Sequence, residues 1–221
     1  MRKVIQLRGF LVQHYLIVDG DEIHVIDGGF IGGISRIQRA LNEMGKTFAN
    51  VSSIIISHGH LDHLLNVAQL QELTHSNVYA PQADRDHIEG RHRYRSLAKV
   101  CGWLEAVGRW LLPYQAPQID HWFKEGDDLM GLKVVSLPGH TSGHSGFLLE
   151  EEKLLLANDL FAHLFSRPSI PPWIFNNNHE RAKESIRKAA DLELKGIYLN
   201  HARKMTPPEA LLALIHLADD L

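Results

Sequence analysis

The chain has 221 residues, of which 44% are hydrophobic and 22% are charged. This composition excludes an intrinsically disordered protein, because disorder requires low hydrophobicity together with a high net charge. The 23 Lys and Arg residues nearly balance the 26 Asp and Glu residues, so the net charge of −3 provides no basic footprint for a nucleic acid. The single cysteine, Cys101, cannot close an intrachain disulfide, which favours a reducing compartment and leads us to expect a cytoplasmic protein.

The first part of the chain is predicted to alternate strands with helices. Short β-branched or apolar runs bounded by glycine and aspartate predict strands, with a tight hairpin at Asp19-Gly20. Apolar residues that recur at helical spacing predict helices over 34–44 and 64–73. The predicted strands cover residues 4–7, 15–18, 23–26, 51–56 and 78–80.

Residues 82–125 interrupt this pattern, and we interpret them as a helical insertion within one domain that covers 1–221. Apolar residues follow at mostly helical spacing from Trp103 to Leu111. Six aromatic residues, from the insertion and from the loop that Pro168, Pro171 and Pro172 force, would either line an apolar substrate pocket or pack the insertion onto the sheet. They are Trp103, Trp110, Trp122, Phe123, Trp173 and Phe175.

The second half of the chain returns to strands and ends in two helices. Asn177, with Glu three positions later, is predicted to cap a helix that runs to Leu192. The Thr-Pro-Pro-Glu segment at 206–209 predicts the start of the last helix. The predicted strands cover residues 133–136, 146–149 and 153–157. Two β-rich halves, each followed by helices, predict a helix–sheet–sheet–helix sandwich.

Histidine is unusually common, and its distribution carries the functional prediction. The fifteen histidines outnumber the eight Phe and five Tyr together. Most are scattered singly, but the His-Gly-His-Leu-Asp-His segment 58–63 places three imidazoles and a carboxylate within six residues, directly after a predicted strand. His58 and His60 lie two positions apart on a strand-to-loop turn, so both can bind one metal ion through imidazole nitrogens.

Further histidine and aspartate residues could bind a second metal ion beside the first. Asp62 and His63 lie two and three positions after His60 and could face a second ion. Asp159 follows the apolar run 154–157, so it should lie at a strand end, where its carboxylate could bridge two metals. Paired cations lower the pKa of a shared water toward neutrality and polarise a carbonyl or phosphoryl oxygen, which makes hydrolysis the predicted chemistry.

The chain resembles the metallo-β-lactamase superfamily in five motifs that occur in the family's order. They are the Asp-centred turn at 26–29, the segment 58–63, the Pro-Gly-His-Thr-Ser-Gly-His-Ser segment at 138–145, Asn158-Asp159 and Asn200-His201. The resemblance covers about residues 14–205. It implies a mixed α/β fold, the four-layer αββα sandwich, with the site at one edge of the β-layers and the helical insertion over the site.

The resemblance also implies a complete set of metal ligands. Three residues would hold the first ion and three the second, with Asp159 as the bridge: His58, His60 and His140 for the first, and Asp62, His63 and His201 for the second. A hydroxide bound there would be the nucleophile. We expect two divalent ions, zinc in the first place, with iron, manganese or cobalt as alternatives that accept the same ligands.

The chain departs from the family pattern at two positions, and three further residues are expected to support the ligands. Asn158 and Asn200 stand where the family usually has glycine, so a side chain occupies a place where the backbone is normally bare. Asp27 is expected to accept the second ring N–H of a ligating histidine, which would fix the tautomer, and Ser57 could act similarly. His144 is expected to make a structural hydrogen bond rather than to bind metal.

Within the superfamily, the sequence favours hydrolases similar to glyoxalase II thioesterases and N-acyl-homoserine lactonases. β-Lactamases that use a thiolate need a cysteine near position 159, whereas Cys101 lies in the insertion. Flavodiiron-type reductases need a flavin domain, for which no residues remain. We therefore expect a binuclear hydrolase that cleaves a small ester, lactone or thioester. Asp62 and His163 are the candidate catalytic residues, His163 as a general acid.

Alternatives in other classes fit part of the same pattern. A mononuclear-iron persulfide dioxygenase would not need His63 and His201 as ligands, and a phosphodiesterase or a metal-containing ligand-binding module would retain the metals. Arg203 and Lys204 would either bind a substrate carboxylate or form a solvated turn. We expect a small-molecule substrate and no membrane partner, because no apolar run approaches the ~20 residues of a membrane span. A homodimer is left open.

Overall fold

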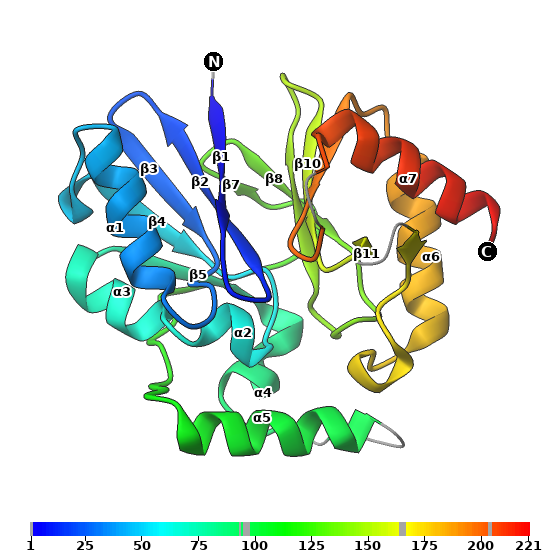
Figure 1. The fold of residues 1–221 in the computed structure, drawn as a ribbon, viewed down its shortest axis with the longest axis horizontal. Helices are drawn as coiled ribbons and strands as arrows, with labels where there is room; N and C mark the ends of the chain where they lie inside the picture. Colours follow the sequence, from blue (N-terminus) through cyan, green and yellow to red (C-terminus); the bar gives the residue numbers. More distant parts are fainter. Residues whose placement is uncertain (1, 93, 95–97, 164–166, 203–204) are drawn as a thin grey trace. The chain divides into compact units, whose positions relative to one another are not determined.

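The computed structural model describes residues 2–92, 94, 98–163, 167–202 and 205–221 (Figure 1). The chain divides into two compact units. Unit 1 contains Met1–His92 and Trp103–Trp122, and unit 2 contains Arg93–Gly102 and Phe123–Leu221. Each unit has its own sheet, helices and apolar core. Among the described residues, no helix is long and apolar enough to cross a membrane.

Unit 1 is built on a six-stranded sheet with the order β1-β2-β3-β4-β5-β6. Its strands are β1 (Lys3–Arg8), β2 (Gln13–Asp19), β3 (Glu22–Ile26), β4 (Val51–Ile55), β5 (Asn77–Pro81) and β6 (His121–Phe123). The first three strands pair antiparallel, whereas β3, β4 and β5 pair parallel. Because Ile26 lies opposite Ile55, β3 and β4 end at the same edge of the sheet, and the Asp27 turn and the segment 58–63 both start there.

The helices of unit 1 confirm most of the predicted periodicity. They are α1 (Gly33–Glu43), α2 (Leu61–Leu64), α3 (Val67–Thr74), α4 (Arg85–Ile88) and α5 (Lys99–Leu111), of which unit 1 contains the part from Trp103 onward, with 3-10 turns η1 (Phe48–Asn50) and η2 (Gln82–Asp84). The helix predicted over 64–73 is divided between α2 and α3. The division falls at Asn66, whose side-chain amide donates to the carbonyls of Gly28, Gly29 and Phe30 at 3.0, 2.9 and 2.7 Å. This tertiary hydrogen bonding fastens the turn after β3 to the start of α3.

The segment 82–125 is helical only in part. It contains α4 and α5, but residues 112–120 form neither helix nor strand, and β6 then joins the edge of the sheet. Of the six aromatic residues singled out above, Trp122 packs against the core of unit 1 and Phe123 is buried. The three exposed ones are Trp103, Trp110 and Trp173, at 65, 81 and 63%.

Unit 2 is built on a five-stranded sheet with the order β13-β10-β9-β8-β7 and a two-stranded ribbon, β11-β12. Its strands are β7 (Asp128–Leu129), β8 (Leu132–Ser136), β9 (Ser145–Leu149), β10 (Leu154–Asn158), β11 (Ala162–His163), β12 (Pro168–Ser169) and β13 (Gly196–Leu199). Because β10 and β13 pair parallel, the residues that follow them emerge at one edge of the sheet. Helices α6 (His179–Ala190) and α7 (Pro207–Asp219) lie side by side, and α7 packs on β13 (Figure 1). A further 3-10 turn, η4 (Trp173–Phe175), precedes α6.

The helix starts of unit 2 show one confirmed prediction and one error. At α7 the Glu209 carboxylate accepts the Thr206 N–H at 2.7 Å, as a capping box requires. At α6 the cap is Asn178, whose side chain accepts the Arg181 N–H at 3.1 Å, so the prediction of Asn177 was wrong by one residue. Asn177 instead donates its backbone N–H to the His140 carbonyl at 2.9 Å, which ties the start of α6 to a predicted ligand.

Candidate metal centre

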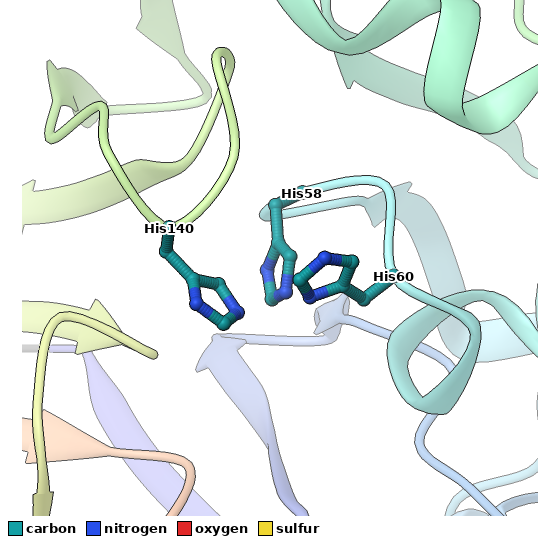
Figure 2. A group of neighbouring side chains, drawn as sticks. All are labelled: His58, His60 and His140. Atoms are coloured by element: carbon teal, nitrogen blue, oxygen red, sulfur yellow. The ribbon is translucent and has the colours of Figure 1, made fainter. Parts of the chain in front are cut away.

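Four of the seven predicted ligands lie in unit 1, on the turn that joins β4 to α2. They form the N-terminal ligand set: His58, His60, Asp62 and His63. Figure 2 shows the imidazoles of His58 and His60 close together on this turn, with ring centroids 4.9 Å apart and planes at 78°. The His63 ring lies 4.1 Å from that of His58, and its Nε2 lies 3.7 Å from Asp62 Oδ2. The short spacing in sequence therefore brings all four side chains into one turn.

Asp27 holds the N-terminal ligand set from the end of β3. Its Oδ2 accepts hydrogen bonds from His63 Nδ1 at 2.8 Å and from the Ser57 hydroxyl at 2.7 Å. The Ser57 Oγ also lies 3.0 Å from His58 Nδ1, and it accepts that ring N–H because its own proton goes to Asp27. With Nδ1 engaged in both rings, Nε2 is the nitrogen that each can direct to a metal. The hydrogen bonds expected of Asp27 and Ser57 are confirmed.

The backbone of this turn is unusual as well. Asp27 has a φ of 64°, a left-handed conformation that residues other than glycine adopt only where the surrounding structure requires it. Its N–H donates to the Ile55 carbonyl, and the Gly28 N–H donates to the His63 carbonyl, both at 2.9 Å. The turn after β3 is thus fastened to β4 and to the last residue of the ligand segment.

The other three predicted ligands lie in unit 2 and form the C-terminal ligand set: His140, Asp159 and His201. His140 lies on the loop between β8 and β9 (Figure 2), Asp159 directly follows β10, and His201 is two residues past β13. Asp159 Oδ2 lies 3.4 Å from Nε2 of His140 and 3.1 Å from Nε2 of His201. One carboxylate oxygen within reach of two imidazoles is the arrangement that a bridging ligand needs.

Two neighbours orient the C-terminal ligand set. His144 donates from Nδ1 to the Leu137 carbonyl at 2.8 Å, and its Nε2 accepts the Asp159 N–H at 3.1 Å, which confirms the structural hydrogen bond expected of His144. Asn176 Oδ1 lies 3.1 Å from His140 Nδ1, so this ring also directs Nε2 outward. Asn176 was not foreseen from the sequence, because an asparagine in a loop is common and no spacing connects it to His140.

The donor atoms fit divalent transition metals. Imidazole nitrogen and carboxylate oxygen are ligands that zinc, iron, manganese and cobalt accept. Three of the candidate ligands, His58, His63 and His140, have Nδ1 hydrogen-bonded to a defined neighbour. Such hydrogen bonds fix the tautomer and the orientation of a metal-ligating histidine.

Comparison with known proteins identifies the family of the chain. A family profile described as the metallo-beta-lactamase superfamily matches residues 7–201. The chain belongs to the metallo-β-lactamase superfamily. It is a hydrolase of that superfamily with His and Asp clusters suited to metal binding.

Curated relatives of the chain are distant. It is 26% identical over 150 residues to the probable metallo-hydrolase YybB of Bacillus subtilis, a match that covers 68% of this chain and 62% of that protein, less than two thirds of its length. It is 27% identical over 193 residues to the hydroxyacylglutathione hydrolase GloC of Haemophilus influenzae, which covers 84% of this chain and 82% of that one.

Solved structures of the superfamily share the fold. A metallo-beta-lactamase family protein of Thermus thermophilus matches with a TM-score of 0.73 at 21% identity, covering 99% of this chain and 78% of that one. The protein TTHA1623, solved in a di-iron-bound form, matches with a TM-score of 0.70 at 24% identity, covering 94 and 96%. The predicted fold class, a mixed α/β fold of the metallo-β-lactamase type, is confirmed.

The departure at Asn158 from the superfamily pattern is accommodated locally. Asn158 has a φ of 51°, a conformation that glycine adopts most easily and that asparagine tolerates better than most residues. Its side-chain Nδ2 donates to the Ser145 carbonyl at 2.7 Å, so the added side chain ties β10 to β9. Asn200 is fully buried and donates its N–H to the Asn158 carbonyl at 3.1 Å. The two asparagines therefore join the ends of β10 and β13.

The remaining predicted site residues lie near the C-terminal ligand set in sequence or fall outside the described residues. His163 is half-buried in β11, and its backbone N–H donates to the His201 carbonyl at 2.8 Å. Arg203 and Lys204 lie outside the described residues.

Proposed function

We propose that the chain is a binuclear metal-dependent hydrolase that cleaves a small ester, lactone or thioester. In this proposal the two ligand sets together hold two divalent ions, zinc in the first place, with iron, manganese or cobalt as alternatives. The assignment follows the superfamily motifs: His58, His60 and His140 for the first ion, Asp62, His63 and His201 for the second, and Asp159 as the bridge.

The observation that carries this proposal is the way the histidines are oriented. His58, His63 and His140 each have Nδ1 hydrogen-bonded, to a serine hydroxyl, a carboxylate and an amide oxygen respectively. This arrangement directs Nε2 of each ring to a metal. His144 provides an internal contrast, because both of its ring nitrogens make hydrogen bonds to backbone groups.

Divalent ions at such a centre lower the pKa of bound water toward neutrality and polarise a substrate carbonyl. Among the chain's own groups, Asp62 is the most accessible carboxylate of the ligand sets, with a side chain 31% exposed, and it can hold the proton that the attacking water releases. His163 is half-buried and can donate a proton to the leaving oxygen or sulfur. Relatives named hydroxyacylglutathione hydrolase support an acyl substrate.

The test is the metal content of the freshly purified protein, followed by hydrolysis of a panel of esters, lactones, thioesters and phosphodiesters. We expect two ions per chain and turnover of at least one acyl class. Asp159→Ala and His60→Ala should lose metal and turnover together, whereas the matched variant His216→Ala, at an exposed position of α7, should lose neither. Unchanged turnover in Asp159→Ala would contradict the proposal.

The same experiment separates the other classes. One iron per chain, with oxygen uptake on a persulfide, would assign the chain to the persulfide dioxygenases. Full metal occupancy without hydrolysis of any ester-type substrate would assign it to metal-containing binding modules.

A further inference from the structure

Two buried or nearly buried carboxylates hold the backbone of the N-terminal ligand set on either side of His60. Asp84 Oδ2 accepts the Gly59 N–H at 2.9 Å, and Glu105 Oε1 accepts the Leu61 N–H at 3.1 Å. Both carboxylates come from the segment 82–125, which the sequence suggested to be an insertion, and both contacts lie within unit 1. Figure 1 shows α4 next to α2, the helix that Leu61 begins, with α5 beyond α4.

A third carboxylate accepts a backbone N–H of the same turn, closer to β4. Asp27 Oδ1 accepts the Ser57 N–H at 2.7 Å, so the backbone amides of residues 57, 59 and 61 each donate to a carboxylate from a different element. His58 and His60 are the residues between these three amides. The backbone on both sides of each imidazole is therefore held by a charge-assisted hydrogen bond, which is stronger than one between neutral groups.

Asp84 contacts both the ligand turn and the helix that follows it. It is fully buried at the end of η2, and its Oδ1 lies 3.5 Å from His87 Nδ1. A buried carboxylate is strongly destabilising unless polar groups surround it, so its contact with the Gly59 amide is part of what makes its burial tolerable. A Cβ at Gly59 would lie 2.3 Å from the Cβ of His87, so no side chain fits there and the turn is held through its backbone.

Glu105 reaches the turn from the other side. Its side chain is 13% exposed, and its Oε2 lies 3.9 Å from Arg109 Nη2. Arg109 in turn donates to the His87 carbonyl at 3.2 Å, which links α5 to α4. Leu61 is the first residue of α2, where a backbone N–H has no acceptor within the helix, and Glu105 supplies one.

We propose that Asp84 and Glu105 are positioning residues of the metal centre, which fix the backbone around His60 before metal binds. The inference rests on the proposed function, in which this turn carries metal ligands. A turn that is ordered in advance gives up less conformational freedom when it binds an ion, so affinity rises without any new ligand. The segment 82–125 would then contribute to the centre through two carboxylates that accept backbone N–H groups of the ligand turn.

The experiment compares Asp84→Ala, Asp84→Asn, Glu105→Ala and Glu105→Gln with wild type. Affinity is measured with Co²⁺ by competition with a chelator, and the Co²⁺ absorption spectrum reports ligand geometry. The alanine variants should bind ~10–100-fold more weakly, the range typical for loss of an outer hydrogen-bond partner of a metal site. The amide variants should fall between, because an amide oxygen still accepts the backbone N–H. The control is Asp86→Asn, at an exposed carboxylate of α4, which should leave affinity unchanged.

A second readout needs no metal. In the metal-free protein, the Gly59 amide should exchange its hydrogen faster in Asp84→Ala and the Leu61 amide faster in Glu105→Ala, each without a change at the other amide. Unaltered exchange, or variants that unfold at lower temperature while retaining wild-type Co²⁺ affinity and spectrum, would overturn the positioning role. A wild-type chain that takes up no metal would overturn the proposed function and this inference together, whereas equal uptake by wild type and all variants would overturn the inference alone.

Discussion

Asp27 and His63 are joined by a hydrogen bond of 2.8 Å between Oδ2 and Nδ1, and neither side chain is exposed. The same carboxylate accepts the backbone N–H and the hydroxyl of Ser57, both at 2.7 Å. One residue at the end of β3 thus positions the first and the last histidine of the ligand segment, directly for His63 and through Ser57 for His58. Replacing it tests positioning without removing a proposed ligand.

Asp27→Asn should weaken metal binding and destabilise the metal-free protein. An amide has one acceptor oxygen in place of two, so either the Ser57 N–H or the His63 ring N–H loses its acceptor. We expect a ~10–100-fold loss of metal affinity and a free energy of unfolding lower by ~2 kcal/mol. Chelator competition and urea unfolding measure the two effects. Asp21→Asn is the control, because Asp21 is 93% exposed and pairs only at the surface with Lys46; equal affinity in Asp27→Asn and wild type would refute the expectation.

His140 and His144 lie four residues apart and should respond differently to the same substitution. His140→Ala removes a proposed ligand, so one ion should be missing even with metal in excess. His144→Ala should retain full occupancy at saturating metal, with affinity weaker by ~10-fold because Asp159 loses the acceptor for its N–H. Metal content after gel filtration in metal-containing buffer distinguishes the two. Loss of a whole ion from His144→Ala would show that His144 is itself a ligand.

The proposed ligands could be named from the sequence because a metal site concentrates rare residue types at short spacing. The segment 58–63 directly follows an apolar strand, so both its capacity to bind metal and its place at a strand end could be predicted. Asp84, Glu105 and Asn176 could not be found in this way. They act through hydrogen bonds to a backbone amide or a ring nitrogen, which many polar residues can make, and the contacts depend on how α5 and the loop before α6 return to the site.

The same reasoning accounts for the errors in secondary structure. The helix predicted over 64–73 is divided because Asn66 donates to three carbonyls of the turn after β3, and periodicity does not register such a tertiary contact. The start of α6 is shifted by one residue because the Asn178 side chain accepts the Arg181 N–H, while the N–H groups of Asn177 and Asn178 both donate to carbonyls of the loop at 139–140. The prediction of capping at Thr206 was correct because its partner, Glu209, lies only three positions further along the chain.

Substitutions at Asn158 should show what the asparagine contributes at a position where the superfamily usually has glycine. Asn158→Gly retains the left-handed backbone but loses the hydrogen bond to the Ser145 carbonyl, so we expect a destabilisation of ~1 kcal/mol. Asn158→Ala loses the hydrogen bond and also strains the backbone, for a total of ~2–3 kcal/mol. Urea unfolding of both variants measures the difference. If alanine were no worse than glycine, the φ of 51° would not be a constraint at this position.

His14 should make the stability of the metal-free protein depend on pH. It is fully buried on β2, and burial lowers its pKa from 6.5 to about 4, an effect that nearby Asp27 opposes in part. The unfolded chain therefore takes up a proton on this residue first as the pH falls. The contribution of His14 to stability is fully present above pH ~6.5 and is lost progressively toward pH ~4, by ~3 kcal/mol in all. His14→Leu cannot bind this proton, so its free energy of unfolding should fall less steeply over the same interval. Urea unfolding of the metal-free proteins at several pH values measures both slopes, with His216→Gln at an exposed position as the control. Identical slopes for wild type and His14→Leu would show that burial does not keep this imidazole neutral.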